Sequence, residues 1–245
     1  MKKAIFNFLK ADIRMPHLMF WDWCFPIILV SVLGIFISET SVSEFLLPGL
    51  ISLFLMQSII FSIPYRLAQY NETGIMRLIQ KKGSIYKLVI SFLISRLIIL
   101  VLQTVIVIFI GKEMMHIKLN INWGFLVASF IITVTIFMMI SSLLGLKLKT
   151  QNSALGLSQA IYFILIGISG IVYPIEKSPE LLRKISVISP LKYISKFWES
   201  SFYGRQIFNL KDIFILLGIS IILGLSVFFV AKSDRKGNKK NENYS

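Results

Sequence analysis

Long apolar runs alternate with short polar stretches along the whole chain. Six of these runs hold about 20 mostly apolar residues each, which is the length that a helix needs to cross a bilayer. They cover residues 18–38, 47–68, 86–110, 123–146, 154–173 and 211–231. The pattern predicts an all-α, polytopic membrane protein with six transmembrane helices in a domain over 1–231, followed by a basic cytosolic tail at 232–245.

Residues 2–14 have a different pattern from the six runs. Ile5, Leu9 and Ile13 recur every four residues and are joined by two further apolar side chains, Phe6 and Phe8. Basic side chains lie between them, at Lys2, Lys3, Lys10 and Arg14. This spacing predicts an amphipathic helix that lies in the membrane interface. The alternative is an unstructured basic leader that only sets the orientation of the protein.

The composition is that of a membrane protein, and this affects how the net charge is interpreted. The 245 residues are 56% hydrophobic and only 16% charged, with a mean hydropathy of +0.76. That leaves too little polar surface to coat a soluble globule. The net charge of +14 is spread in short clusters between apolar runs, which favours contact with anionic lipid headgroups over binding to nucleic acid.

Orientation follows from the lysines and arginines of the short connections. The N-terminus has four, 69–85 has three, 147–153 has two and the tail has five, whereas 39–46 has none and 111–122 has two. The positive-inside rule therefore predicts cytosolic termini. The segment 174–210, predicted to be outside, has six Lys or Arg against three Glu, and we expect it to form packed or re-entrant helices. The Lys-, Ile- and Asn-rich composition favours an AT-rich bacterial genome, and therefore a bacterial plasma membrane.

Chemistry that would power transport within this chain is missing from the sequence. Asp22 lies between Trp21 and Trp23 and is expected at the headgroup interface. Arg96 is the charged residue well inside a predicted span; it either snorkels to the headgroups or contacts another helix. No phosphate-binding loop occurs, so any nucleotide would be hydrolysed by a partner chain and no cofactor is expected here.

Catalysis and metal binding also lack the residues that they need. Cys24, His17 and His116 are too few and too scattered for a metal site, and no Ser-His or Asp-Asp arrangement appears. The sequence therefore predicts that the protein is not an enzyme.

The stretch "YNETGIMRLIQKKGS", residues 70–84, connects the second and third runs. Ile75, Leu78 and Ile79 fall at helical spacing, with Arg77, Lys81 and Lys82 beside them. A short amphipathic helix of this kind can bury its apolar edge in a partner and hold it with charges at the rim. The alternative is a solvated turn with interfacial lysines.

A second unusual stretch, "LIGISGIVYPIEKSPELLRKISVISPLKY", covers residues 165–193. Ser169, Gly170, Pro174, Pro179, Pro190 and Tyr193 divide it into short pieces. Because prolines begin or interrupt helices, a short outer helix is expected at 179–188. Aromatic residues follow at Phe197, Trp198, Phe202 and Tyr203, and their density predicts an interface or a packed site rather than a free loop.

Both stretches resemble the membrane subunits of ABC-2 type transporters. In that family the fifth span ends in Ser-Gly, followed by prolines and a Pro-Leu-x-Tyr-like corner. A Glu-x-Gly element, here Glu72 and Gly74, precedes an aliphatic helix between spans two and three. The resemblance implies that Glu72, Gly74, Ile75, Arg77, Leu78 and Ile79 couple the protein to an ATPase. Ile75 and Gly83 depart from the threonine and proline that are common at these positions.

The resemblance also implies a function. It predicts the permease subunit of an exporter that works as a homodimer or heterodimer with a separate ABC ATPase. The cargo class would be a drug, an antimicrobial peptide, a lipid or a similar amphipathic molecule. Gln57, Ser58, Gln103 and Gln159 are polar points that either face the cargo or join helices. The alternative function is a non-transporting structural or sensory protein that binds a soluble partner at 70–84.

Overall fold

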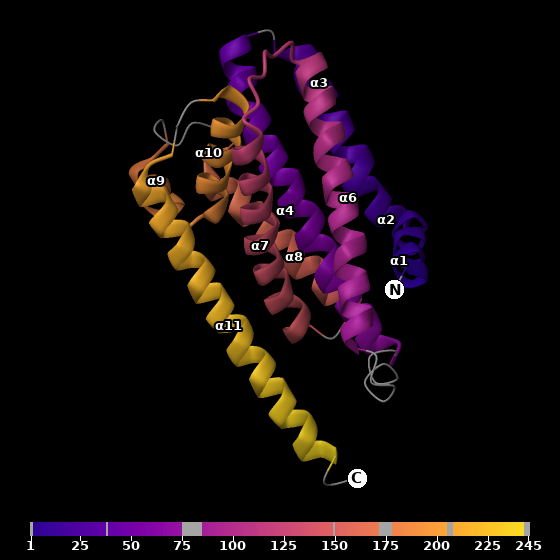
Figure 1. Cartoon of the computed structure of the whole chain (residues 1–245). Helices are drawn as coiled ribbons and strands as arrows, with labels where there is room; N and C mark the ends of the chain where they lie inside the picture. The colour runs from indigo at the N-terminus through magenta and orange to yellow at the C-terminus, as the bar shows by residue number, and fades with distance from the viewer. Residues whose placement is uncertain are drawn as a thin grey trace.

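The computed structural model describes residues 2–37, 39–74, 85–148, 150–171, 178–204 and 208–242. Within these ranges the chain forms helices and the connections between them (Figure 1). In chain order these are α1 (Lys2–Ile13), α2 (Pro16–Met19), the π-helix η1 (Phe20–Cys24), α3 (Phe25–Phe36), α4 (Thr40–Glu72), α6 (Ile85–Met114), α7 (Trp123–Lys147), α8 (Gln151–Ser169), α9 (Glu180–Ser186), α10 (Pro190–Tyr203) and α11 (Leu210–Glu242).

The centre of the molecule is α4, whose apolar stretch is wholly buried by other helices. It packs most extensively against α7, α8 and α10, and its core side chains include Leu47, Phe54, Met56 and Ile60. With 33 residues, α4 is about 50 Å long, longer than the hydrocarbon layer of a bilayer. Its lower end in Figure 1 therefore reaches the side of the molecule where α7 ends and α8 begins.

The N-terminal elements form a separate layer along α6 (Figure 1). Both α1 and α3 pack against α6, and Phe8 of α1 meets Phe92 of α6 edge to face at 5.6 Å. Gly34 permits the close approach of α3, because a Cβ at this position would lie 2.7 Å from the Cβ of Met114. Of the residues 2–14 predicted as an amphipathic helix, Lys2–Ile13 are helical and lie against the helix bundle.

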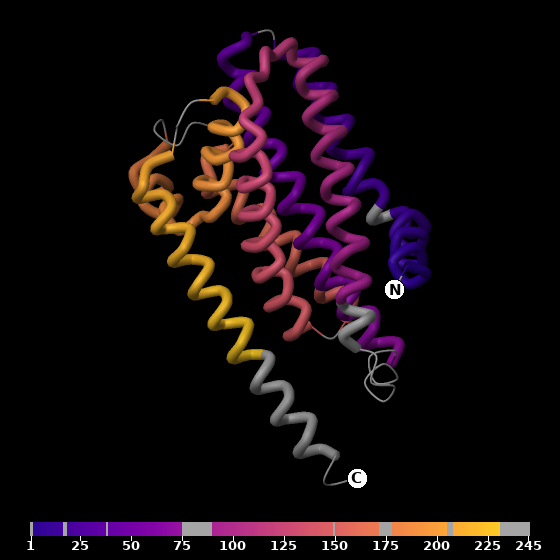
Figure 2. The backbone as a smooth tube through the Cα atoms, viewed as in Figure 1, coloured from indigo at the N-terminus to yellow at the C-terminus, as the bar shows by residue number. Residues whose placement is uncertain are grey.

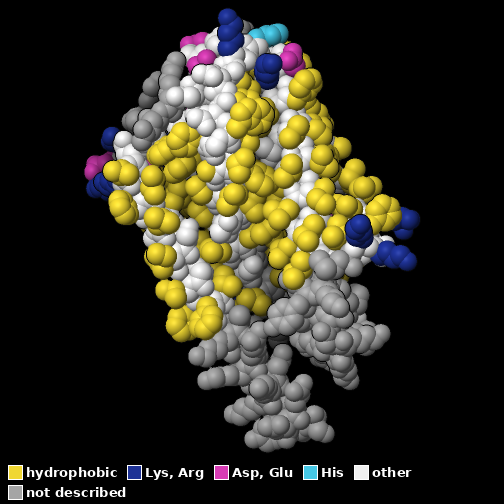
Figure 3. Space-filling model, in the orientation of Figure 1, with side chains coloured by type: hydrophobic (Ala, Val, Ile, Leu, Met, Phe, Trp, Pro, Cys, Tyr) yellow, Lys and Arg dark blue, Asp and Glu magenta, His cyan; other side chains and the backbone are white. Residues whose placement is uncertain are grey.

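On the opposite side, α11 packs against α7 and leaves most of its apolar surface uncovered. Exposed side chains on this helix include Phe214, Leu217, Ile221 and Phe228. Figure 3 shows a broad apolar band on this face of the molecule, with charged side chains gathered at the upper end, at the left edge near α9 and over α1. Such a band suits lipid rather than water.

Five of the described helices are long and apolar enough to cross a membrane: Thr40–Glu72, Ile90–Met114, Trp123–Lys147, Gln151–Ser169 and Leu210–Val230. The first predicted span, 18–38, contains a shorter apolar helical stretch, Phe20–Phe36. It is also divided, because the Phe25 N–H bonds to the Phe20 carbonyl five residues earlier and so widens the turn around Asp22. A topology with six transmembrane helices therefore requires that Phe20–Phe36 also crosses the membrane.

The path of the chain brings several connections to one side (Figure 2). The start of α1 and the ends of α4 and α7 all lie in the lower half of the view, and α11 descends toward the same side. The α3–α4 and α6–α7 turns lie at the top. Helix ends thus lie on two opposite sides of the bundle, as expected of helices that cross a membrane one after another.

Candidate functional site

The Glu-x-Gly element lies at the end of α4. The Thr73 N–H donates to the Gln69 carbonyl at 3.0 Å, and Gly74 then takes a left-handed backbone with φ of 69°. Glycine adopts this conformation without steric cost, so Gly74 turns the chain out of the helix. Ile75, Arg77, Leu78 and Ile79 lie outside the described residues, and their role in coupling stays a prediction.

Glu72 makes a contact that the sequence did not reveal. Its two carboxylate oxygens accept hydrogen bonds from the backbone N–H of Gln151, at 2.9 Å, and from the Gln151 side-chain amide, at 2.5 Å. Glu72, near the end of α4, thus holds the start of α8. A carboxylate is favourable there because the N-terminal end of a helix carries unpaired N–H groups and partial positive charge.

The other end of α8 carries the Ser169–Gly170 motif. Gly170 ends α8 in a left-handed conformation with φ of 75°, and the Ser169 hydroxyl accepts from the Ile171 N–H at 3.3 Å. A single helix of 19 residues, about 28 Å long, therefore joins the Glu72 element to the Ser169–Gly170 corner. The two stretches that the sequence singled out are connected through α8.

Beyond that corner, the other predicted motif residues shape two short helices. Pro179 is the N-cap of α9, Pro190 is in the first turn of α10, and the Tyr193 hydroxyl donates to the Val187 carbonyl at 3.0 Å. Pro174 lies outside the described residues. α9 (Glu180–Ser186) falls within the short helix expected at 179–188.

The aromatic cluster after Tyr193 is packed, as its density predicts. Trp198 and Phe202 are fully buried, and the Trp198 indole N–H donates to the Thr133 hydroxyl of α7 at 3.0 Å. Tyr203 donates to the Glu44 carbonyl of α4 at 3.1 Å. Burial, and then the charges of Glu44 and Glu199, raise the pKa of the Tyr203 phenol, which therefore remains a donor.

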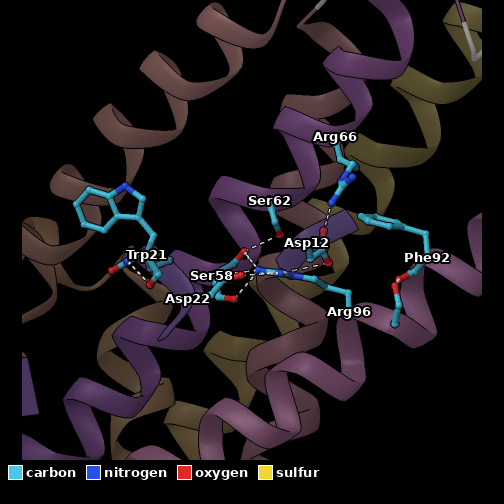
Figure 4. A network of polar contacts seen from close by, with 10 residues as sticks. Asp12, Trp21, Asp22, Ser58, Ser62, Arg66, Phe92 and Arg96 are labelled. Carbon is cyan, nitrogen blue, oxygen red and sulfur yellow. Dashed lines mark hydrogen bonds and ion pairs between the residues drawn. The ribbon is translucent and has the colours of Figure 1, made fainter. Parts of the chain in front are cut away.

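A buried charge cluster is the most distinctive polar feature of the helix bundle (Figure 4). We define it by Asp12, Asp22, Ser58, Arg66 and Arg96, which come from α1, η1, α4 and α6. The guanidinium of Arg96 forms two hydrogen bonds with the Asp22 carboxylate, at 2.8 and 3.0 Å. It also donates to the carbonyl and hydroxyl oxygens of Ser58, each at 2.5 Å.

The second ion pair of the cluster joins Arg66 of α4 to Asp12 of α1. The second carboxylate oxygen of Asp12 lies 3.9 Å from Arg96 and has no hydrogen-bond donor among the described residues. Two carboxylates thus face two guanidinium groups, so their formal charges cancel. Cancellation matters because a buried charge without a partner is strongly destabilising.

This arrangement corrects two expectations about charged residues. Asp22 was expected at the headgroup interface, but only 3% of its surface is exposed, because the widened turn of η1 places it against Arg96. Arg96 does not snorkel, since its side chain is completely buried and bonded to Asp22 and Ser58. Of the two interpretations of Arg96, snorkelling is wrong and contact with another helix is confirmed.

Asp12 and Arg66 were missed, although the sequence carries a signal for Asp12. It follows Ile5 and Phe8 at seven and four positions, so it occupies the apolar face of α1. A carboxylate on the apolar side of a basic helix needs a buried cation. The sequence carries no such signal for Arg66. It comes two residues after Pro64 near the end of a span, and an arginine that snorkels to the headgroups would have the same local sequence.

The polar side chains predicted within the spans differ in whether they form hydrogen bonds. The Gln57 amide donates to the Trp21 carbonyl at 3.0 Å and accepts from the Tyr162 hydroxyl at 2.7 Å. Ser58 belongs to the charge cluster. Gln103 is buried, and its amide has no hydrogen-bond partner among the described residues. Gln159 is half-buried on α8. Gln57 and Ser58 therefore join helices.

Comparison with known proteins gives one clear family. The search of curated proteins finds no match. The model of the family described as ABC-2 type transporter matches residues 6–203, which is most of the chain and includes the Glu72 element, the charge cluster and the Ser169–Gly170 corner. The protein is a multi-pass membrane protein that belongs to the ABC-2 type transporter family, whose members are the membrane components of ABC transporters.

Proposed function

We propose that the chain is the permease subunit of an ABC exporter. Two permease subunits, identical or different, would form the translocation path, and a separate ABC ATPase would bind residues 70–84. The cargo would be an amphipathic molecule such as a drug, an antimicrobial peptide or a lipid. Export and this cargo class rest on the family resemblance.

The observation that carries the proposal is the bond between Glu72 and the start of α8. A displacement of the 70–84 stretch by an ATPase would pull on both the end of α4 and, through Glu72, on Gln151. Because α8 is a continuous helix, the displacement would reach Ser169 and Gly170 at its far end. The charge cluster would carry the same displacement from α4 and α6 to η1 and α1.

Energy supply gives the direct test of this function. In proteoliposomes the purified chain alone is expected neither to hydrolyse ATP nor to move a fluorescent amphipathic cation down an imposed proton gradient. Among the described residues, the buried acids Asp12 and Asp22 are paired with arginines and Asp212 is paired with Lys196, so they are poorly suited to carry protons. Co-purified with its ATPase, the chain is expected to support ATP-dependent efflux that an ATPase-inactive partner abolishes.

Two results would contradict the proposal. Proton-driven movement by the isolated chain would show a secondary transporter. A complex that forms with a soluble partner at 70–84 but gives no nucleotide-dependent movement of any amphipathic probe would favour a structural or sensory protein.

Orientation is part of the proposal and has its own test. We place both termini and residues 70–84 in the cytosol, with Phe20–Phe36 as the first of six crossings. In a Cys24→Ser background, cysteine at the exposed positions Ser41 or Glu180 should react with an impermeant thiol reagent in intact cells. Lys81→Cys should react only after the membrane is opened. Labelling of Lys81→Cys in intact cells would reverse the orientation.

A further inference from the structure

A pocket of about 570 Å³ opens between α1, η1 and α6. Its walls are mainly apolar, with Phe6 and Ile13 from α1, Trp23 from η1, and Ile98 and Leu102 from α6. Phe6, Ile13 and Leu102 are each about half or more exposed. This volume falls within the range of sites that hold small apolar ligands.

The inner wall of the pocket is electrically neutral. Asp12 and Asp22 reach this wall, but Arg66 and Arg96 compensate their charges from behind. A cation inside the pocket would therefore gain little electrostatic stabilisation, and an uncharged hydrocarbon chain suits the apolar walls better.

A second, basic hollow adjoins the pocket. It has a volume of about 360 Å³ and is lined by Lys2, Lys3, Phe6 and Asn7. Phe6 lines both spaces, and Lys10 lines the apolar pocket. Figure 3 shows the basic side chains gathered over α1 beside apolar ones.

The charge of this hollow is uncompensated within the described part of the chain, where Lys2, Lys3 and Lys10 form no ion pair. Lys3, Asn7 and Lys10 recur at helical spacing and are exposed on one side of α1. Asp12, the acid of this helix, points to Arg66 instead. An anionic group is thus the natural partner of the hollow.

We propose that the pocket and the basic hollow together bind one anionic phospholipid. An acyl chain occupies the space between α1 and α6, and the phosphate is held by Lys3 and Lys10. The long apolar stems of these lysines lie along the helix while their ammonium groups reach the headgroup. A second copy of the chain fits this face less well, because a symmetric contact would bring two basic α1 helices together.

Native mass spectrometry of the purified chain gives the test. Titration with phosphatidylglycerol is expected to show one tightly retained lipid, and phosphatidylcholine with the same acyl chains should bind about tenfold more weakly. Glycerol phosphate, which has the headgroup charge but no chain, should not compete. A photoreactive phosphatidylglycerol should crosslink to both α1 and α6.

Variants separate the two halves of the site. Lys3→Glu with Lys10→Glu should remove the preference for phosphatidylglycerol, and Leu102→Trp, which fills the pocket, should remove retention of both lipids. The matched controls are Lys118→Glu, on the exposed α6–α7 connection, and Leu217→Trp, on the uncovered side of α11. Both controls should bind as the unmodified chain does.

Each other outcome overturns the proposal. Equal binding of the two lipids would remove the role of the lysines, and competition by glycerol phosphate would show a phosphate site without a chain. Dimers that dissociate in the Leu102→Trp variant would assign the pocket to a second copy. If a variant fails to fold, crosslinking of the unmodified chain still decides, since labels confined to α7 or α11 would refute the site. None of these results depends on export.

Discussion

Arg96→Met is expected to lower the stability of the protein by about 3–5 kcal/mol, because it leaves the buried Asp22 carboxylate without its cation. Asp22 and Ser58 together receive four hydrogen bonds from this one guanidinium. For a chain of this size the loss corresponds to a fall in melting temperature of roughly 10 °C. Thermal unfolding in detergent measures it.

A second substitution shows whether charge is the cause. Asp22→Asn together with Arg96→Met removes both charges and leaves Asp12 paired with Arg66, so most of the lost stability should return. Arg183→Met on the exposed surface of α9 is the control and should change stability by less than about 0.5 kcal/mol. If the double variant were as unstable as Arg96→Met alone, the packing of the arginine and not its charge would hold these helices.

Leu78→Asp is expected to abolish export while leaving membrane insertion intact. Burial of one aliphatic side chain in a partner contributes roughly 1.5–3 kcal/mol, and aspartate would remove that contribution and add an unpaired charge. Association with the ATPase should therefore weaken by about tenfold or more. Co-purification of the ATPase and ATP-dependent efflux are the two measurements.

The control for Leu78 is Lys82→Ala, which changes the polar side of the same stretch and should leave both measurements nearly unchanged. If Leu78→Asp inserted normally and still retained a fully active ATPase, residues 70–84 would be a turn and not the receiving element. Arg96→Met provides the contrast, since its defect should be visible in stability without any partner.

The helices of this protein follow from local properties of the sequence, and for that reason they could be predicted. Hydrocarbon demands long apolar runs with internally bonded backbones, so each predicted run lies largely in a helix. The limits of the first run were harder to place, because the apolar pattern does not signal the π-helical turn at Phe20–Cys24, which places Asp22 against Arg96.

The partners of polar side chains could not be predicted in the same way. Asp12 meets Arg66 across 54 positions and Glu72 meets Gln151 across 79. Such pairings are decided by how helices pack, and the local pattern of residues along the chain does not show which helices will meet. What the sequence could supply was the requirement that a charge on an apolar face has a partner, as for Asp12.

The contact between Tyr203 and Glu44 has a consequence for biosynthesis. Pro48 lies inside α4 and has no N–H to give to the carbonyl of Glu44, four residues earlier. The hydroxyl of Tyr203, at the end of α10, donates to that carbonyl instead. Since the ribosome makes residue 203 long after residue 48, the upper part of α4 remains one hydrogen bond short until α10 emerges and folds against it.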